Sequence, residues 1–444
     1  MEVLLDYLEE DSRNVFIDLT PQSLSSSPET CLASDLPGFV RPISTAIGED
    51  SVSNKEGSQG KVSLLLFQAI MFSATTFVDL DDLQKAGYSS REEAHEAFFQ
   101  KAHLLYQSHY ESDPLTTLQA LLLMTHRAKA TDGKDSRYWI EVAISLALMM
   151  GLFRDLPTGY ARHYNQKLHR RVAWTCYMAD SLIALRLRCL PLIRSVDFNV
   201  SLLTEDDFDV GHISMDSQLL LPWCTFIRCV EVQKYLADIC VSQAQLCLCI
   251  RRVLNVQARR NSAEISSDAI ATPPESPNKH HSDYLSSIWM SQKALTDWEY
   301  SLSPISQRPP TVFGIGSHES PLVTLHRNVL HMIYQGVVCV LYQSQIFQSS
   351  TSRMQHAARQ ITEIATELDD MNLLHSLPII GSTTILIAMI IHLAEVQASS
   401  PQRSRSALRN DIDAARTWLK QSNADMRSQT RGQPAALALV DLGH

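Results

Sequence analysis

Apolar side chains recur at intervals of three and four positions along most of the chain after residue 61, and few glycines or prolines interrupt the pattern. This spacing is typical of amphipathic helices, whereas strands alternate apolar and polar positions. The pattern predicts an all-α fold, an irregular stack of roughly ten or more helices with no sheet. We expect helices near residues 61–77, 90–109, 114–130, 136–151, 163–187, 216–254, 283–301, 321–348, 352–370, 379–397 and 404–424.

Several predicted helix ends carry a residue suited to that position. Ser89 or Ser90 can cap the helix that begins near residue 90, and Asp113 stands before Pro114 at a first helical position. Gly151 is a natural helix stop. These local signals support the helix boundaries independently of the apolar spacing.

Two of the predicted helices differ in how they should be buried. The helix at 216–254 has too many apolar residues for a single stripe, so we expect it to be central in the fold. The helix at 136–151 should present one stripe to its neighbours, with Arg137 and Glu141 on the opposite face. The expected stripe is Trp139, Val142, Ala143, Leu146 and Met150.

Composition divides the chain into four segments. Residues 1–60 mix Ser, Pro, Gly and acidic residues, which predicts a disordered acidic tail; residues 1–19 either fold onto a partner groove or form an ordinary solvated terminus. Residues 61–254 form a first helical block. Residues 255–282 combine Ser, Pro, Asn and mixed charge without a period and are expected to be a disordered linker. Residues 283–444 form a second helical block.

Charge limits the partners that the chain can bind by itself. The 444 residues carry a formal net charge of −10, so the chain lacks an overall basic field for nucleic acid or an anionic membrane. Basic residues cluster at 251–260 and at 401–431, either as a nuclear-import or phosphate-contact segment or as a solvated helix face. The first residues do not resemble a secretion signal, and the longest apolar runs are too short to cross a bilayer. We expect an intracellular protein without membrane partners.

The cysteines predict neither disulfides nor a zinc site. There are nine, an odd number, and most stand inside apolar helical patterns. No C-x2-C pair occurs anywhere in the sequence, and only Cys31 precedes residue 176. We therefore expect buried free thiols and no cofactor in this chain.

No motif for catalysis is present. Phosphate-binding glycine loops, a nucleophile elbow, HExxH and an EF-hand loop are all absent from the sequence. The acidic clusters at 79–82 and 205–209 are expected to be solvated turns, because neither has the spacing that aims carboxylates together from a helix. An all-helical metal–carboxylate enzyme would need two such facing motifs. The chain is therefore predicted not to be an enzyme.

The most specific stretch runs from residue 98 to residue 208. It begins FFQKAHLLYQSHYESDPLTTLQALLLM, continues RYWIEVAISLALMMGLFRD, and then gives HRRVAWTCYMADSLIALRLRCLPLIRSVDFNV followed by EDDF. This order resembles the middle homology region of fungal zinc-cluster transcription factors, especially the cutinase transcription factor group, and the resemblance covers about residues 61–250. The residues that carry this signature are Trp139, Arg154, Asp155, Arg170, Arg171, Trp174, Tyr177, Asp180, Arg188, Pro191, Arg194 and Asp197.

We expect these signature residues to be architectural rather than catalytic. Arg170 and Arg171 can reach acids or carbonyls around the following turn, and Trp174 can share a core with Tyr177. Asp180 is expected to pair with one of three nearby arginines, at 186, 188 or 194. A buried lattice of this kind would fix how the loop around the proline at 191 packs on the helices.

The chain departs from the pattern of the proteins that it resembles. Ala173-Trp174 stands where they commonly have Trp-Trp, and Asp180-Ser181 stands where they have Asp-Arg. Gly-Arg-Pro, or a near variant, is replaced by the stretch from Arg188 to Pro191. These changes put the local ion pairs in question but leave the helical scaffold intact.

The resemblance implies a nuclear transcriptional regulator of a fungal lipid or secondary-metabolite gene set. Residues 61–254 would be the middle homology region and 283–444 the C-terminal part of the same regulatory domain. DNA would be reached only through a partner or a zinc cluster that this sequence lacks, so zinc is expected only with an upstream cluster. Transcriptional coregulators and a homodimeric or heterodimeric partner are also implied.

An alternative function is a small-molecule sensor that does not bind DNA itself. Its pocket would lie between the helices of 136–187 and the helix at 216–254 and would take a small apolar effector. Residues of this kind more often form ordinary core. The expected lining is Met149, Met150, Phe153 and Tyr177.

Overall fold

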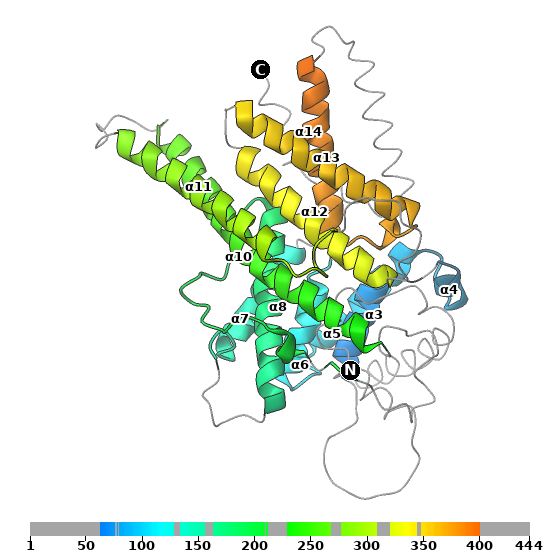
Figure 1. Ribbon diagram of the computed structural model, residues 1–444. Coiled ribbons are helices and arrows are strands. Elements are labelled where there is room, and N and C mark those ends of the chain that lie inside the picture. Colours follow the sequence, from blue (N-terminus) through cyan, green and yellow to red (C-terminus); the bar gives the residue numbers. More distant parts are fainter. Residues whose placement is uncertain are drawn as a thin grey trace, which may run out of the picture. The chain divides into compact units, whose positions relative to one another are not determined.

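The computed structural model describes residues 63–75, 78, 80–127, 134–155, 163–208, 210–211, 229–267, 277–308, 320–343 and 348–399 (Figure 1). Within these residues eleven α-helices and two 3-10 helices form the fold, and the β-type pairing is limited to an isolated bridge between Arg154 and Asn199. The all-α prediction is therefore confirmed. The predicted acidic tail, the helix near 404–424 and the basic cluster at 401–431 lie outside the described residues, and the division into four segments stays a prediction.

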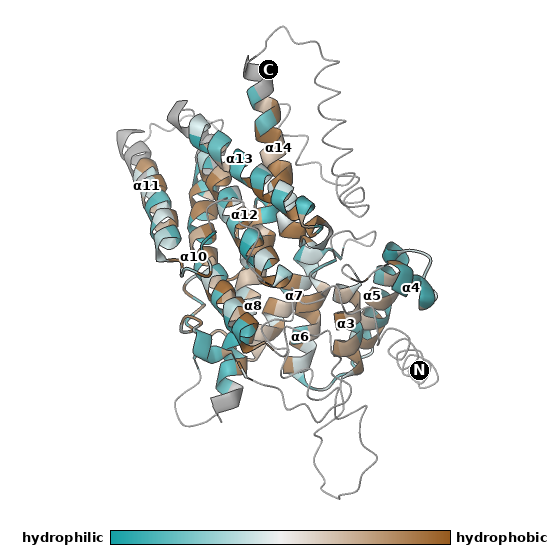
Figure 2. Cartoon of the chain, turned by 45° about the vertical axis from the view of Figure 1, so that its right-hand side comes forward, coloured by the Kyte–Doolittle hydropathy of each residue, from teal (hydrophilic) through white to brown (hydrophobic). Residues whose placement is uncertain are grey.

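The first compact unit takes in residues up to Ala179 and from Ile193 to Val241. It holds α3 (Leu64–Ala74), α4 (Leu80–Lys85), α5 (Arg91–Gln107), α6 (Pro114–Met124), α7 (Ser136–Met149) and the first part of α8 (His163–Leu187). Helix α3 packs on α5 and α6, and α6 packs on α7. Figure 2 shows that α3 is mainly hydrophobic and α4 hydrophilic, which agrees with the deep burial of α3.

Large aromatic side chains fill the core of this unit. Phe72, Phe99 and Trp139 are fully buried, and the rings of Phe99 and Trp139 meet edge to face with centroids 5.8 Å apart. The guanidinium of Arg127 lies over the Phe99 ring at 3.9 Å. The Trp139 indole N–H donates to the carbonyl of Lys134 at 3.1 Å, so its polar atom is satisfied inside the core.

The predicted caps are confirmed. The Ser90 side chain accepts from the backbone N–H of Glu93 at 3.1 Å and caps α5. Asp113 accepts from Thr116 N–H at 2.9 Å and caps α6, with Pro114 in its first turn. Gly151 follows the end of α7 with φ of 68°, a left-handed conformation that glycine adopts without strain.

The stripe predicted for α7 is rotated relative to the one observed. Trp139 and Ala143 are buried as expected, but Val142 and Leu146 are only half-buried. The fully buried positions are instead Ser136, Trp139, Ile140, Ala143, Ile144 and Ala147. Small residues at 136, 143 and 147 allow close approach of the neighbouring helix, so size as well as hydropathy decides which face is buried.

The second unit takes in Asp180–Leu192 and the residues from Ser242 onward. It contains the larger part of α10 (Val230–Ser267) together with α11 (Pro277–Ser301), α12 (Pro321–Gln343), α13 (Gln348–Asp370) and α14 (Ile379–Ser399). Helix α12 packs on α13 and α14 and is buried along most of its length. A side chain at Gly336 would place its Cβ 2.8 Å from the Thr384 methyl group, so glycine permits the close approach of α12 and α14.

The helix bounds predicted on either side of residue 255 differ from those observed. Helix α10 continues to Ser267 and α11 already begins at Pro277, so much of the expected linker is helical. At its other end α10 begins at Val230, after the undescribed residues 212–228. Among the described helices, α10 alone is long and apolar enough over 230–260 to cross a membrane, but 61% of its apolar 18-residue stretch is buried, as in the core helix of a globular fold. This burial agrees with the central role expected for it.

Polar bonds fix α11 on its neighbours within the second unit. The indole N–H of Trp298 donates to the Ser242 carbonyl on α10 at 2.9 Å. Its ring stacks on Tyr334 of α12 with centroids 5.2 Å apart, and the Tyr334 hydroxyl donates to the Glu299 carboxylate at 2.8 Å. One face of α11 is therefore held in a defined orientation.

A buried histidine in the first unit should make stability depend on pH. Burial, with help from His126 and Arg127, lowers the pKa of His95 from its usual value to about 4. Because the folded pKa is lowered, stability is complete above pH 6.5 and falls as pH drops toward 4. Between pH 7 and pH 4.5 we expect His95 to account for a loss of about 2 kcal/mol.

Denaturant unfolding of the parent and His95→Asn at both pH values measures this contribution. The variant should lose less stability on acidification than the parent. Equal losses in the two proteins would show that the His95 ring is solvated in the folded state.

Candidate functional site

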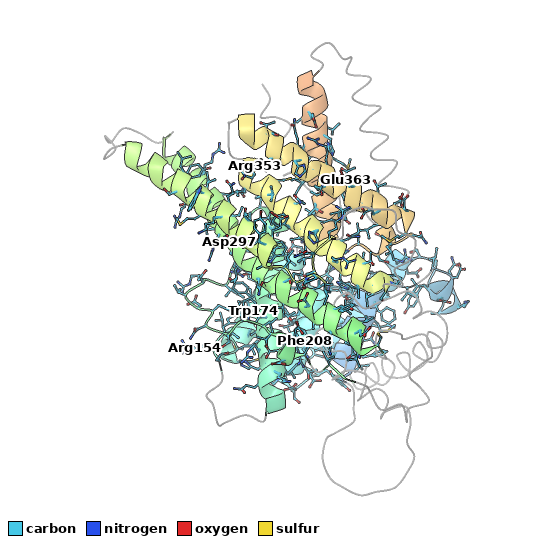
Figure 3. The ribbon with its side chains drawn as sticks, in the orientation of Figure 1. Arg154, Trp174, Phe208, Asp297, Arg353 and Glu363 are labelled. Atoms are coloured by element: carbon cyan, nitrogen blue, oxygen red, sulfur yellow. The ribbon has the colours of Figure 1, made fainter. Side chains whose placement is uncertain are left out.

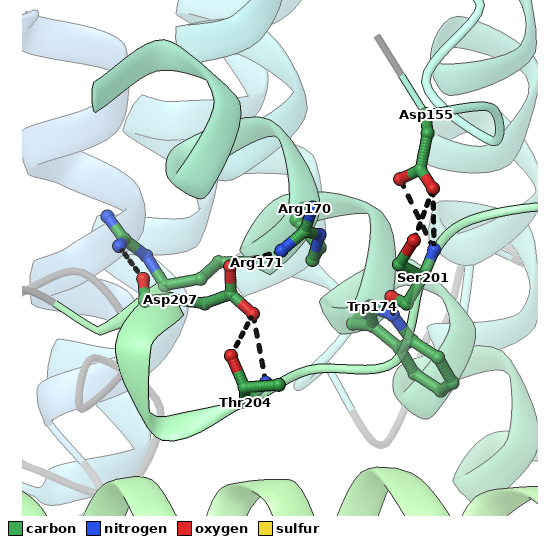
Figure 4. A network of polar contacts seen from close by, with 7 residues as sticks. All are labelled: Asp155, Arg170, Arg171, Trp174, Ser201, Thr204 and Asp207. Carbon is green, nitrogen blue, oxygen red and sulfur yellow. Dashed lines mark hydrogen bonds and ion pairs between the residues drawn. The ribbon is translucent and has the colours of Figure 1, made fainter. Parts of the chain in front are cut away.

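The twin arginines of the signature hold the turn at residues 204–208. The guanidinium of Arg170 on α8 pairs with the Asp207 carboxylate at 2.6 Å, and Arg171 donates to the Asp207 backbone carbonyl (Figure 4). Asp207 also accepts from the backbone N–H of Thr204 at 2.9 Å and from its hydroxyl at 3.1 Å. One buried carboxylate thus joins α8 to the short 3-10 helix Glu205–Asp207.

The prediction that residues 205–209 form a solvated turn is wrong for Asp207. The Asp207 side chain is only 3% exposed, and its charge is balanced by Arg170. The missed signal was the spacing of Thr204 and Asp207, which is a capping-box pattern. In the second acidic cluster Asp82 pairs with Lys85 at 2.7 Å on the surface of α4.

The segment after residue 198 is held between Asp155 and Trp174. The Asp155 carboxylate accepts from Ser201 N–H at 3.1 Å and from its hydroxyl at 2.5 Å, while the Trp174 indole N–H donates to the Ser201 carbonyl at 2.8 Å (Figure 4). Trp174 is 1% exposed, and its ring meets Tyr177 and Phe198, each with centroids 5.1 Å apart. Figure 3 marks Trp174 among the side chains of this unit. The cluster of Trp174, Tyr177 and Phe198 therefore fixes α8 against the loop at residues 198–201.

Asp180 forms a buried ion pair in the second unit. Its carboxylate accepts from the Arg251 guanidinium of α10 at 2.6 Å, and the two side chains are 0% and 4% exposed. Arg251 also donates to the Ser181 hydroxyl at 2.7 Å, and Asp180 accepts from Leu192 N–H at 2.9 Å. The carboxylate thus joins α8, α10 and the loop that follows α8.

The ion pair between Asp180 and Arg251 was not among the pairs predicted, which joined Asp180 to Arg186, Arg188 or Arg194. Arg194 pairs instead with Asp197 through two bonds of 2.6 and 3.0 Å at the surface. Arg188 ends α8 with φ of 54°, and burial lowers its pKa to about 10. Arg251 belongs to the basic cluster at 251–260, for which a solvated helix face is one of the two predictions. Arg252 and Arg259 are exposed, but Arg251 is buried. Ser181 stands where resembling proteins have arginine, and here it contacts Arg251.

The remaining signature residues have plainer positions. Pro191 is half-buried in the loop after α8, and Arg154 is exposed beside its backbone bridge to Asn199. The signature residues therefore belong to several local contacts distributed over the two units. The contacts described for the signature residues are made with other residues of the same chain.

The predicted effector lining does not form one surface. Met149 is 80% exposed at the end of α7, and Met150 is half-buried. Phe153 and Tyr177 are buried and pack against Phe198 with centroids 5.6 and 4.4 Å apart. These two aromatic residues take part in core packing, so an apolar effector remains only a prediction.

The described residues contain no group of three or more His, Cys, Asp or Glu side chains that could hold a metal ion. The cysteines among them are thiols that form no disulfide: Cys176, Cys189, Cys229, Cys240, Cys247, Cys249 and Cys339. Burial raises the pKa of the Cys339 thiol to about 12, so it stays protonated and unreactive at neutral pH.

Comparison with known proteins gives one consistent family. The sequence pattern of the fungal specific transcription factor domain matches residues 39–372. Cutinase transcription factor 1 beta of Fusarium vanettenii is 37% identical over 378 residues, which are 81% of this chain and 43% of that protein. Transcription factor cpaR of Aspergillus oryzae is 29% identical over 76% of this chain and 58% of its own length.

A further relative is the fusaric acid cluster transcription factor FUB12 of Fusarium oxysporum f. sp. lycopersici, 28% identical over 37% of this chain and 24% of its own length. The chain spans less than two thirds of the length of each of these relatives. No solved structure matches the sequence.

Proposed function

Because the chain belongs to the fungal specific transcription factor domain family, we propose that it regulates transcription of a fungal lipid or secondary-metabolite gene set. The family match over residues 39–372 carries this proposal, and the names of the cutinase and fusaric acid cluster relatives support the choice of gene set. The family is one of regulators and not of enzymes. The bonded arginine and aspartate pairs of α8 agree with a scaffold role.

The proposed mechanism separates regulation from DNA recognition. The helical domain binds coregulators in the nucleus, and a partner subunit or a zinc cluster outside this sequence reads the DNA. The sequence holds no C-x2-C pair to begin such a cluster, and its net charge of −10 does not favour phosphate contact.

The isolated chain should therefore form no sequence-specific complex with promoter DNA in electrophoretic mobility assays at physiological salt. The reason is that the described residues contain no metal-ligand group and the chain as a whole is acidic. Adding the DNA-binding partner, or joining a zinc cluster to the chain, should restore a shift. A nanomolar complex of the chain alone that survives high salt would contradict this separation.

Tethering tests the regulatory role directly. The full chain fused to an unrelated DNA-binding domain should change the expression of a reporter that carries that domain's sites several-fold in a fungal host. The matched control is the DNA-binding domain alone, expressed at the same level. Expression identical to the control would contradict the proposed function.

A further inference from the structure

Helix α11 has an outer face on which several large apolar side chains are exposed among the residues that the structure describes. Leu285, Trp289, Met290 and Tyr300 are 42%, 63%, 57% and 83% exposed, whereas Ile288, Leu295 and Trp298 on the opposite side are buried. Trp289 and Tyr300 lie close to the middle of the exposed arc, with Leu285 and Met290 at its edges. Two exposed aromatic residues on one helix face mark an interaction surface.

Charged residues of opposite sign stand within the same face. Lys293 is exposed one turn after Trp289, with its ammonium 5.9 Å from the centroid of that ring, and Asp297 is exposed one turn later. Asp297 is labelled on α11 in Figure 3. The face therefore presents, in order, an aromatic residue, a cation, an anion and a second aromatic residue.

This order is self-complementary under a two-fold rotation. When two copies of α11 run antiparallel about a point between Lys293 and Thr296, Trp289 of each copy lies opposite Tyr300 of the other. The same register brings Lys293 of one copy next to Asp297 of the other. Apolar contact and charge pairing are thus satisfied together, which a random apolar patch would not achieve.

We propose that α11 pairs two copies of this chain as an antiparallel, two-fold symmetric homodimer. The buried face of α11, held by Trp298 on Ser242 and Tyr334, orients the outer face for this contact. A single pair of helices forms a small interface, so the dimer is expected to dissociate in the micromolar range. The dimer is independent of the proposed function, because it is measured on the full chain without DNA.

Sedimentation of the full chain over a concentration series measures the association. Trp289→Ser should raise the dissociation constant about thirty-fold, because the aromatic residue is the central anchor. Met149→Ser, at a methionine of the first unit that is 80% exposed, should leave the constant unchanged. Far-UV circular dichroism and thermal midpoints should match the parent for both variants, since both side chains are exposed.

Charge exchange tests the register. Lys293→Asp and Asp297→Lys should each weaken the dimer about tenfold by placing like charges together, and the double variant should return to within about threefold of the parent. A chain that stays monomeric up to about 100 μM would overturn the proposal. So would a dimer that Trp289→Ser does not weaken, or a double exchange that is weaker than both single ones.

Discussion

Asp180→Ala is expected to lower the free energy of unfolding by about 3 to 5 kcal/mol. The substitution leaves the Arg251 guanidinium buried without its carboxylate, which lies 2.6 Å away in the folded chain. It also removes the acceptor of Leu192 N–H and so loosens the loop after α8. The side chains of Asp180 and Arg251 are 0% and 4% exposed, so solvent cannot replace the lost ion pair.

The chain offers a matched control for this effect. Arg194 and Asp197 are also joined at 2.6 Å, but their side chains are 75% and 36% exposed. Arg194→Ala should therefore cost less than about 1 kcal/mol. Equal effects of the two substitutions in urea unfolding would contradict the burial of the pair at 180 and 251.

Removing both charges should restore much of the loss. In Asp180→Leu/Arg251→Met no uncompensated charge is left inside the second unit, and apolar side chains occupy similar volume. Recovery should be incomplete, because Leu192 N–H and the Ser181 hydroxyl still lack their partners. We expect the double variant to be at least about 2 kcal/mol more stable than Asp180→Ala.

Trp174→Ala should lower the free energy of unfolding by about 3 kcal/mol or more. The change opens a cavity beside Tyr177 and Phe198 and leaves the Ser201 carbonyl without the indole N–H that donates to it at 2.8 Å. Trp174→Phe keeps most of the ring contacts and should cost roughly half as much, since mainly the hydrogen bond is lost.

Val196→Ala is the control for Trp174 within the following loop. Its side chain is 83% exposed, so truncation should change stability by less than about 0.5 kcal/mol. Denaturation midpoints of the three variants against the parent measure the series. A midpoint for Trp174→Ala close to that of Val196→Ala would show that the ring is not part of the core.

The sequence predicted features that depend on neighbours within one or two turns. Helix α8 was predicted at its observed bounds, and Arg188 leaves the helical conformation directly after it. The caps at Ser90 and Asp113 were predictable, since a cap and its acceptor lie three residues apart.

Features that depend on distant residues were missed. Asp180 and Arg251 are 71 positions apart, so no local spacing could identify the pair, and three nearer arginines were more plausible partners. The buried face of α7 was misplaced because both sides of the helix carry large apolar residues: Ile140 and Ile144 are buried, whereas Val142 and Leu146 are half-buried. The end of α10 was missed because its last turns lack an apolar period while remaining helical.

If the signature residues brace the scaffold and do not act on a ligand or substrate, regulation should depend on them only through folding. The most direct test places Asp180→Leu/Arg251→Met in the tethered reporter assay beside the parent and Asp180→Ala, with the folded fraction of each measured. The change in reporter expression should be proportional to the folded fraction of each variant. The double variant should therefore regulate the reporter nearly as well as the parent. A double variant that is folded but no longer regulates the reporter would contradict a packing role, because the Asp180–Arg251 pair would then serve recognition.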